Sequence, residues 1–289
     1  MANYPQLDDQ VGVWKLKEVN DAVMGGYWRK TAGGGSRAIC SGGVTPSYTG
    51  LIEHYNMSSS GNSTFFGDLS VARGEHGTMA NFTRCIMAGG NTATSPNSTN
   101  VIDYVEIATT GNAQDFGDLT QAKTALMATS SPTRGVWIGG RTGPGVGDKV
   151  ATIEYSTIAT LGNNADFGDL TAATSHIAAC SNAVRALSGM GYISPSANTA
   201  TNTIEYVTIA TLGNSLDFGD STRAHYNLKA CSSSTRGVFV GGGTPSSPYN
   251  TNTMDYGQFA STGNLVDFGD LLDANNEAAG CTSNGHGGL

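Results

Sequence analysis

The sequence predicts an all-β fold, a five-bladed β-propeller of four-stranded antiparallel blades, and three observations lead to that prediction. The stretch GNAQDFGDLT at 111–120 recurs in four other copies. Its Phe116 and the equivalent Phe of the other copies follow one another at spacings of 50, 51, 51 and 50 residues. Each copy holds four short extended runs separated by turns with Gly or Asn. Tandem four-stranded units of roughly 40–50 residues are typical of propeller blades, which cover one another's faces.

The composition agrees with such a fold. Among 289 residues only 13% are charged and 40 are Gly, which favours short strands and tight turns over helices. A formal net charge of -8 argues against a nucleic-acid partner. No apolar run is long enough to span a bilayer, so we expect no membrane insertion. The first ten residues, MANYPQLDDQ, do not resemble a signal peptide, so we expect a chain made in the cytoplasm and not exported by that route.

Two regions are expected: an arm over residues 1–30 and a propeller over residues 31–289. In the arm, apolar residues of VGVWKLKEVNDAVMGGYW keep a helical spacing and are followed by two glycines. A helix of this length is marginal alone, so it must dock on the propeller or on another protein. The candidate anchor residues are Trp14, Leu16, Val19, Val23 and Trp28.

Each propeller unit has four elements in a fixed order. The first strand follows the Gly-Asp of the motif, the second starts at an Arg and ends in glycines, and the third carries an acid before a Tyr. The fourth strand follows a Gly-Asn turn and contains the Phe-Gly-Asp. We expect the arginines to pair with the acids within or between sheets. The arginines are Arg37, Arg84, Arg134, Arg185 and Arg236, and the acids are Glu53, Asp103, Glu154, Glu205 and Asp255.

Ring closure follows from where the units begin and end. The first unit starts at Arg37 in its second strand, and the last unit is followed by DLLDANNEAAGCTSNGHGGL, which contains a further first strand. We therefore predict that the C-terminal strand completes the first sheet, which removes open sheet edges.

The triplet Asp-Phe-Gly also occurs in protein kinases, where it holds magnesium. Here no phosphate loop or catalytic loop accompanies it, and five evenly spaced copies indicate architecture instead of an active site. We expect the second Asp of each copy to cap the turn that follows. A ring of such Asp residues binding calcium is the open alternative. The residues are Asp68, Asp118, Asp169, Asp220 and Asp270.

Catalytic signals are absent from the sequence. It contains no HExxH, GxSxG or Walker motif and no metal spacing of His, so we predict no enzyme, no cofactor and no metal site. A galactose-oxidase-like copper enzyme is the catalytic alternative. Cys180, Cys231 and Cys281 share one repeat position that also accepts Met and Thr, which indicates free structural thiols. A redox or metal role is the alternative for them.

Binding residues are sought in the loops that vary between copies. In this strand order the loops between second and third strands share one face with the connections between blades, and these loops differ most in sequence. Their aromatic and polar residues suit a sugar or a protein surface, although loops that have only drifted would look similar. The candidates are Tyr48, Asn97, Arg141, Tyr192 and Tyr249.

Two resemblances follow from these motifs. The double Gly that ends the second strand and the aromatic residue near the fourth resemble kelch-type blades over residues 36–289, with Phe in place of the kelch Trp. The combination of VWKLKEV with RGVFVGG, NTIEYVTIATLGN and DFGDLT resembles proteins of tailed phages, especially marine and cyanobacterial ones. That resemblance implies a tail-fibre or other virion-surface component, located on the virion, and a homo-oligomer.

Two functions are therefore weighed. The first is a non-enzymatic virion structural protein, such as a tail fibre, an adhesin or a capsid-decorating protein. Its residues 1–30 would bind other virion proteins, and its loops would contact a host-surface glycan or protein. The second is a free lectin-like binding module without a particle. Deleting residues 1–30 separates the two hypotheses, because only the first predicts that the deletion abolishes incorporation.

Overall fold

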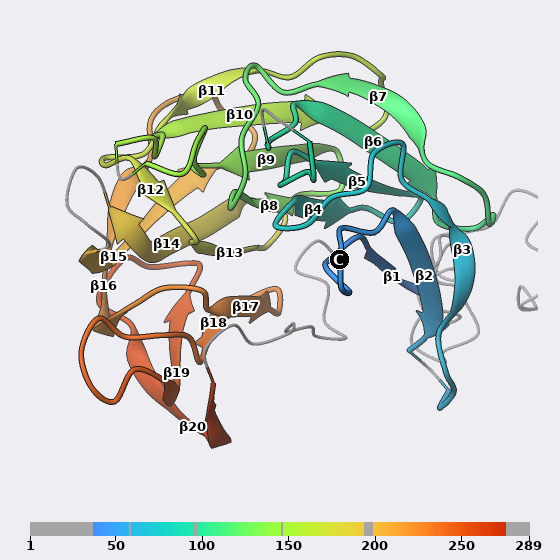
Figure 1. Cartoon of the computed structure of the whole chain (residues 1–289). Helices are drawn as coiled ribbons and strands as arrows, with labels where there is room; N and C mark the ends of the chain where they lie inside the picture. The colour runs from blue at the N-terminus through green and yellow to red at the C-terminus, as the bar shows by residue number, and fades with distance from the viewer. Residues whose placement is uncertain (1–36, 58, 95–96, 146, 194–198, 276–289) are drawn as a thin grey trace, which may run out of the picture.

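The computed structural model describes residues 37–275, apart from 58, 95–96, 146 and 194–198. Within these residues the chain forms five antiparallel β-sheets and no helix. The sheets follow one another around a common axis (Figure 1). The fold is a five-bladed β-propeller, so the predicted fold class is confirmed. The predicted helical arm and the predicted C-terminal closing strand lie outside the described residues.

The sheets are numbered 1 to 5 in chain order. Sheet 1 contains β1 (Arg37–Ser41), β2 (Leu51–Asn56) and β3 (Thr64–Asp68). Sheet 2 contains β4 (Gly77–Ala80), β5 (Arg84–Ala88), β6 (Val101–Glu106) and β7 (Gln114–Asp118). Sheet 3 contains β8 (Met127–Ser130), β9 (Arg134–Ile138), β10 (Thr152–Thr157) and β11 (Ala165–Asp169). Sheet 4 contains β12 (Thr174–Ser175), β13 (Ala178–Ser181), β14 (Arg185–Ile193), β15 (Thr199–Thr208) and β16 (Leu216–His225). Sheet 5 contains β17 (Lys229–Ser232), β18 (Arg236–Val240), β19 (Thr251–Gln258) and β20 (Val266–Asn275).

Sheets 1, 2, 3 and 5 are meanders in which sequential strands pair, and in sheet 4 both β12 and β13 pair with β14. The first strands β4, β8, β13 and β17 lie nearest the axis, and β3, β7 and β11 lie at the rim (Figure 1). Neighbouring inner strands contact one another from sheet to sheet. In sheet 4 the second and third strands continue past a register shift at Gly189/Gly191, and β12 pairs with the end of β14.

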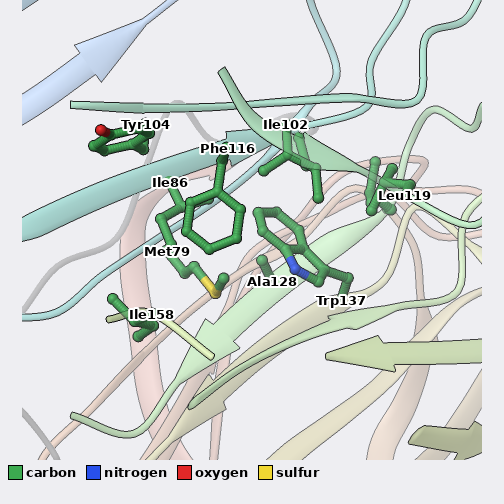
Figure 2. Close-up of a cluster of buried hydrophobic side chains, with 11 residues drawn as sticks. Met79, Ile86, Ile102, Tyr104, Phe116, Leu119, Ala128, Trp137 and Ile158 are labelled. Atoms are coloured by element: carbon green, nitrogen blue, oxygen red, sulfur yellow. The ribbon is translucent and has the colours of Figure 1, made fainter. Parts of the chain in front are cut away.

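The hydrophobic core lies between the sheets, in clusters that each join adjacent blades. Figure 2 shows the cluster between sheets 2 and 3, where Trp137 of β9 packs beside Phe116 of β7 and Met79 of β4. Trp137 is fully buried, and its indole N–H donates to Ser156 Oγ at 2.8 Å. Because one sheet cannot bury both of its faces, each blade depends on its neighbours for stability.

The repeated motif joins the outer strand of one sheet to a turn of the next. The Gly111 N–H donates to the Phe66 carbonyl at 2.9 Å, and the Asp68 N–H donates to Asn112 Oδ1 at 3.1 Å. A Cβ added to Gly67 would collide with the Gly111 carbonyl, so the position requires Gly. The same close approach occurs at Gly117 with Gly162, Gly168 with Gly213, and Gly219 with Gly263. The motif is therefore an inter-blade joint, and this contact uses the backbone of its second Asp.

The repeated arginines take a different partner from the one predicted. The Arg84 guanidinium lies 4.9 Å from the ring centroid of Tyr104 in its own sheet, and it donates to the Ile158 carbonyl of the next sheet at 3.0 Å. Arg134, Arg185 and Arg236 lie over Tyr155, Tyr206 and Tyr256 in the same way. The expected pairing with the repeated acids is wrong because these arginines sit at the ends of their strands, beside the Tyr that follows the acid and the carbonyls of the next blade.

In sheets 2 and 3 the repeated acid instead pairs with a cation from the connection that enters the sheet. Arg73 forms a 2.8 Å ion pair with Asp103, and Lys123 forms a 2.7 Å ion pair with Glu154. All four side chains are almost completely buried. A buried pair of this kind fixes geometry, and removing one partner leaves an uncompensated charge.

Candidate functional site

The loops predicted to share one face do so. The connection that enters sheet 3 bridges to the loop after β9 at Thr124 and Arg141, and the connection that enters sheet 2 bridges to the loop after β5 at Gly74 and Asn91. Sheet 5 repeats this pairing at Tyr226 and Gly243. We call this side of the propeller the top face.

A ring of backbone hydrogen bonds ties the blades together on the top face. The Ala125 N–H donates to the Glu75 carbonyl at 3.0 Å, the His176 N–H to Ala125 at 3.0 Å, and the Asn227 N–H to His176 at 3.2 Å. All four residues occupy one repeat position and have positive φ of 52° to 57°. The hydrogen bonds fix the backbone, while the side chain differs among these four residues, so this position can carry a specific function.

Three of the five predicted binding residues line one cavity. Tyr48 from sheet 1, Asn97 from sheet 2 and Arg141 from sheet 3 surround a hollow of about 420 Å³. The other lining residues are mainly hydroxyl, amide and small side chains: Asn91, Thr92, Ala93, Ser98, Thr124, Thr142, Gly143 and Pro144. The cavity therefore combines one aromatic ring with many hydrogen-bonding groups from three consecutive blades.

Glu75 organises one wall of this cavity. Its Oε2 accepts a hydrogen bond from Asn91 Nδ2 at 2.9 Å and one from Thr124 Oγ1 at 3.1 Å, and it lies 3.4 Å from an Arg141 guanidinium nitrogen. These three donors belong to cavity-lining residues, so one carboxylate orients all of them. The sequence prediction missed Glu75. The available signal was its repeat position, which holds Ala, His and Asn in other copies.

The remaining two candidates lie elsewhere. Tyr192 stacks on Tyr226 with ring centroids 4.3 Å apart, and its edge meets His176 at 5.4 Å. Burial, together with the nearby Arg141 charge, lowers the pKa of His176 to about 4, so this imidazole is neutral at physiological pH. Tyr249 is 65% exposed in the loop after β18. Neither Tyr192 nor Tyr249 lines the cavity.

The described residues contain no group of three or more His, Cys, Asp or Glu side chains that could hold a metal ion. Cys40, Cys85 and Cys180 are free thiols, which agrees with the prediction for Cys180. Burial raises the pKa of Cys85 to about 12, which makes this thiol a poor nucleophile. Cys281 and the five candidate anchor residues of the arm lie outside the described part.

Comparison with known protein families finds no model that matches this chain, and comparison with curated proteins finds no similar sequence. The described region contains no helix long and apolar enough to cross a bilayer.

Proposed function

We propose that this propeller is a non-enzymatic binding protein of a phage particle, and that its top-face cavity takes a polar, sugar-like ligand on the host surface. The observation that carries the binding role is the convergence of Tyr48, Asn97 and Arg141 on one cavity. The virion assignment is supported by the sequence resemblance to phage proteins.

A sugar-like ligand suits the chemistry of the cavity. An aromatic ring offers a face for the apolar side of a pyranose, and amides and hydroxyls supply both donors and acceptors for its hydroxyl groups. The Arg141 guanidinium adds a fixed fork of donors beside the Glu75 carboxylate. Because Glu75 holds three lining residues in place, much of the cavity is arranged before a ligand enters, which lowers the entropy lost on binding.

A glycan array with the purified chain, followed by calorimetry on the best ligand, tests the binding role. We expect Tyr48→Ala and Arg141→Ala each to weaken binding at least about tenfold, the effect of losing ~1.4 kcal/mol. Tyr249→Ala is the matched control, because it removes an exposed tyrosine from another top-face loop outside the cavity. Equal affinity of all three variants would refute the assignment of this cavity.

Mass spectrometry of gradient-purified particles tests the virion assignment. We expect a fixed copy number relative to the major capsid protein, and we expect deletion of residues 1–30 to abolish incorporation while leaving the propeller folded. Absence from clean particles, together with sugar binding that survives the deletion, would instead establish the free lectin-like module.

A further inference from the structure

In sheets 2 and 3, one position in the connection that enters the sheet supplies a cation to the buried acid of that sheet. It is Arg73 for Asp103 in sheet 2 and Lys123 for Glu154 in sheet 3. In sheet 5 the equivalent residue, His225, lies close enough for the Asp255 charge to act on its pKa. Sheet 4 has Thr174 at this position, so its acid, Glu205, receives no cation from the connection.

A second substitution accompanies the first. The residue paired across the strands with the acid is Met87 in sheet 2, Trp137 in sheet 3 and Phe239 in sheet 5. In sheet 4 the residue paired with Glu205 is Ser188. Paired residues of an antiparallel ladder share one face of the sheet, so sheet 4 lacks both the cation and the bulky side chain beside its acid.

The two substitutions coincide with a cavity of about 160 Å³. Thr174, Ser188 and Glu205 all line it. So does Thr203, which is equivalent to the Thr152 whose hydroxyl lies 3.3 Å from Lys123 Nζ in sheet 3. The cavity thus has, at one end, the same two groups that hold the lysine ammonium in the neighbouring sheet.

Most of the remaining cavity wall is apolar, and the cavity opens to the surface. Leu170, Ile177 and Met190 are each at most 8% exposed and line the interior. Thr171 and Ala172 are exposed and connect the cavity to the surface. An apolar wall that leads to a polar end suits a ligand with a hydrocarbon stem and a charged tip.

Glu205 is only 6% exposed. The Thr171 hydroxyl and N–H donate to it, and Ser215 Oγ donates at 2.6 Å. Within the described part of the chain no Lys, Arg or His forms an ion pair with it. A carboxylate that is buried without a cation is costly for a fold, and a bound cation from outside removes that cost.

We propose that the sheet 4 cavity binds a primary alkylammonium group, which takes the place that the Lys123 side chain fills in sheet 3. The ammonium bonds to the Glu205 carboxylate and the Thr203 hydroxyl, and the alkyl stem packs against Leu170, Ile177 and Met190. A free amine and a lysine side chain of another protein share this chemistry. This site goes beyond the proposed function, and its lining residues are different from those of the top-face cavity.

Titration calorimetry of the full chain with n-butylammonium, at constant ionic strength, tests the proposal. Binding is expected for n-butylammonium but not for n-butanol, which lacks the charge, nor for tetramethylammonium, which lacks N–H donors. Nα-acetyl-lysine amide identifies the source: its binding indicates a lysine of a partner protein, and binding of n-butylammonium alone indicates a free amine.

Two variants test the location of the site. Thr174→Lys places a tethered ammonium in the cavity, so it is expected to abolish n-butylammonium binding and to raise the unfolding midpoint. Thr211→Lys is the matched control, because it adds the same charge at an exposed turn of the same sheet and is expected to leave binding unchanged. Glu205→Gln is expected to reduce the affinity at least tenfold.

Three results would overturn the proposal. The first is no heat of binding with n-butylammonium, and the second is equal binding of n-butanol or of potassium ion. The third is full binding by the Thr174→Lys variant with an unchanged unfolding midpoint. The binding and stability measurements on Thr174→Lys do not require the Glu205→Gln variant, so together they test the site even if Glu205→Gln fails to fold.

Discussion

Sheets 3 and 4 are neighbours with the same strand plan, but they treat the same buried acid differently. In sheet 3, Lys123 neutralises Glu154 and Trp137 fills the space beside it. In sheet 4, Thr174 and Ser188 leave Glu205 beside a cavity. The outer joints and the arginine contacts are common to both sheets. Sheet 4 can therefore lack both the buried cation and the bulky side chain of sheet 3, because its outer joints and its arginine contact still hold it to the neighbouring sheets.

The largest expected difference comes from removing the internal cation of sheet 3. Lys123→Met leaves Glu154 buried without its partner, and we expect unfolding free energy to fall by about 3–5 kcal/mol. At the equivalent position of sheet 4, Thr174→Ala removes a buried methyl group and a hydroxyl that donates to the Ala172 carbonyl at 2.9 Å, at a cost of about 1–2 kcal/mol. Urea unfolding at neutral pH measures both variants. Similar losses of unfolding free energy in Lys123→Met and Thr174→Ala would show that the Lys123–Glu154 ion pair does not stabilise sheet 3 relative to sheet 4.

The second expected difference is in how the unfolding free energy of Lys123→Met depends on pH. Burial alone would raise the pKa of Glu154, but the Lys123 charge and the hydrogen bonds from Lys123 and Thr120 outweigh burial, so the pKa is lowered. A lowered folded-state pKa contributes stability that is present above the unfolded value, near 4.3, and is lost as the pH falls through the folded value. In Lys123→Met only the Thr120 hydrogen bonds still oppose burial, so the pKa of Glu154 rises and the acid takes up a proton more readily.

We therefore expect the gap in unfolding free energy between the parent chain and Lys123→Met to narrow as the pH falls from 7 to below 4. Each unit of pKa difference corresponds to about 1.4 kcal/mol. Urea unfolding of both chains across this range measures the gap. A gap that stays constant down to pH 3 would mean that lost packing of the lysine stem, and not an uncompensated Glu154 charge, causes the destabilisation.

The propeller could be predicted from the sequence because its signals are local and repeated. The GN and FGD parts of the motif meet at the four inter-blade joints within the described residues, where Gly67, Gly117, Gly168 and Gly219 have no room for a side chain. The alternation and spacing of the strands are equally regular. Divergence of the loops after the second strands pointed to Tyr48, Asn97 and Arg141, which do meet.

What the sequence could not supply was the pairing of side chains across strands. The arginines and the repeated acids recur at the same period, so spacing alone could not show that Arg84 lies over Tyr104 while Asp103 takes Arg73. Arg73, Lys123, Thr174 and His225 vary in type, which hid their shared position. The sheet 4 cavity depends on two residues, Thr174 and Ser188, that are distant in sequence from Glu205 and unremarkable alone.

The smallest expected difference is between the arginine contacts of the two sheets. Arg134 lies 4.6 Å from the Tyr155 ring centroid and donates to the Ile209 carbonyl at 3.0 Å. Arg185 lies 4.7 Å from the Tyr206 ring centroid and donates to the Phe259 carbonyl at 2.8 Å. Arg134→Ala and Arg185→Ala should each lower the unfolding free energy by about 1–2 kcal/mol, with a difference of less than about 0.5 kcal/mol.

Urea unfolding of these two variants decides how far the difference between the sheets extends. Equal losses would show that sheets 3 and 4 differ only around the buried acid. The proposed ammonium site requires this, because it replaces the Lys123 ammonium of sheet 3 with a bound ammonium in sheet 4 and changes nothing else. A clearly smaller loss for Arg185→Ala would show that sheet 4 is held less firmly at its ends as well. The cavity would then be one sign of a loosened blade, and stabilisation by Thr174→Lys would not by itself establish a cation site.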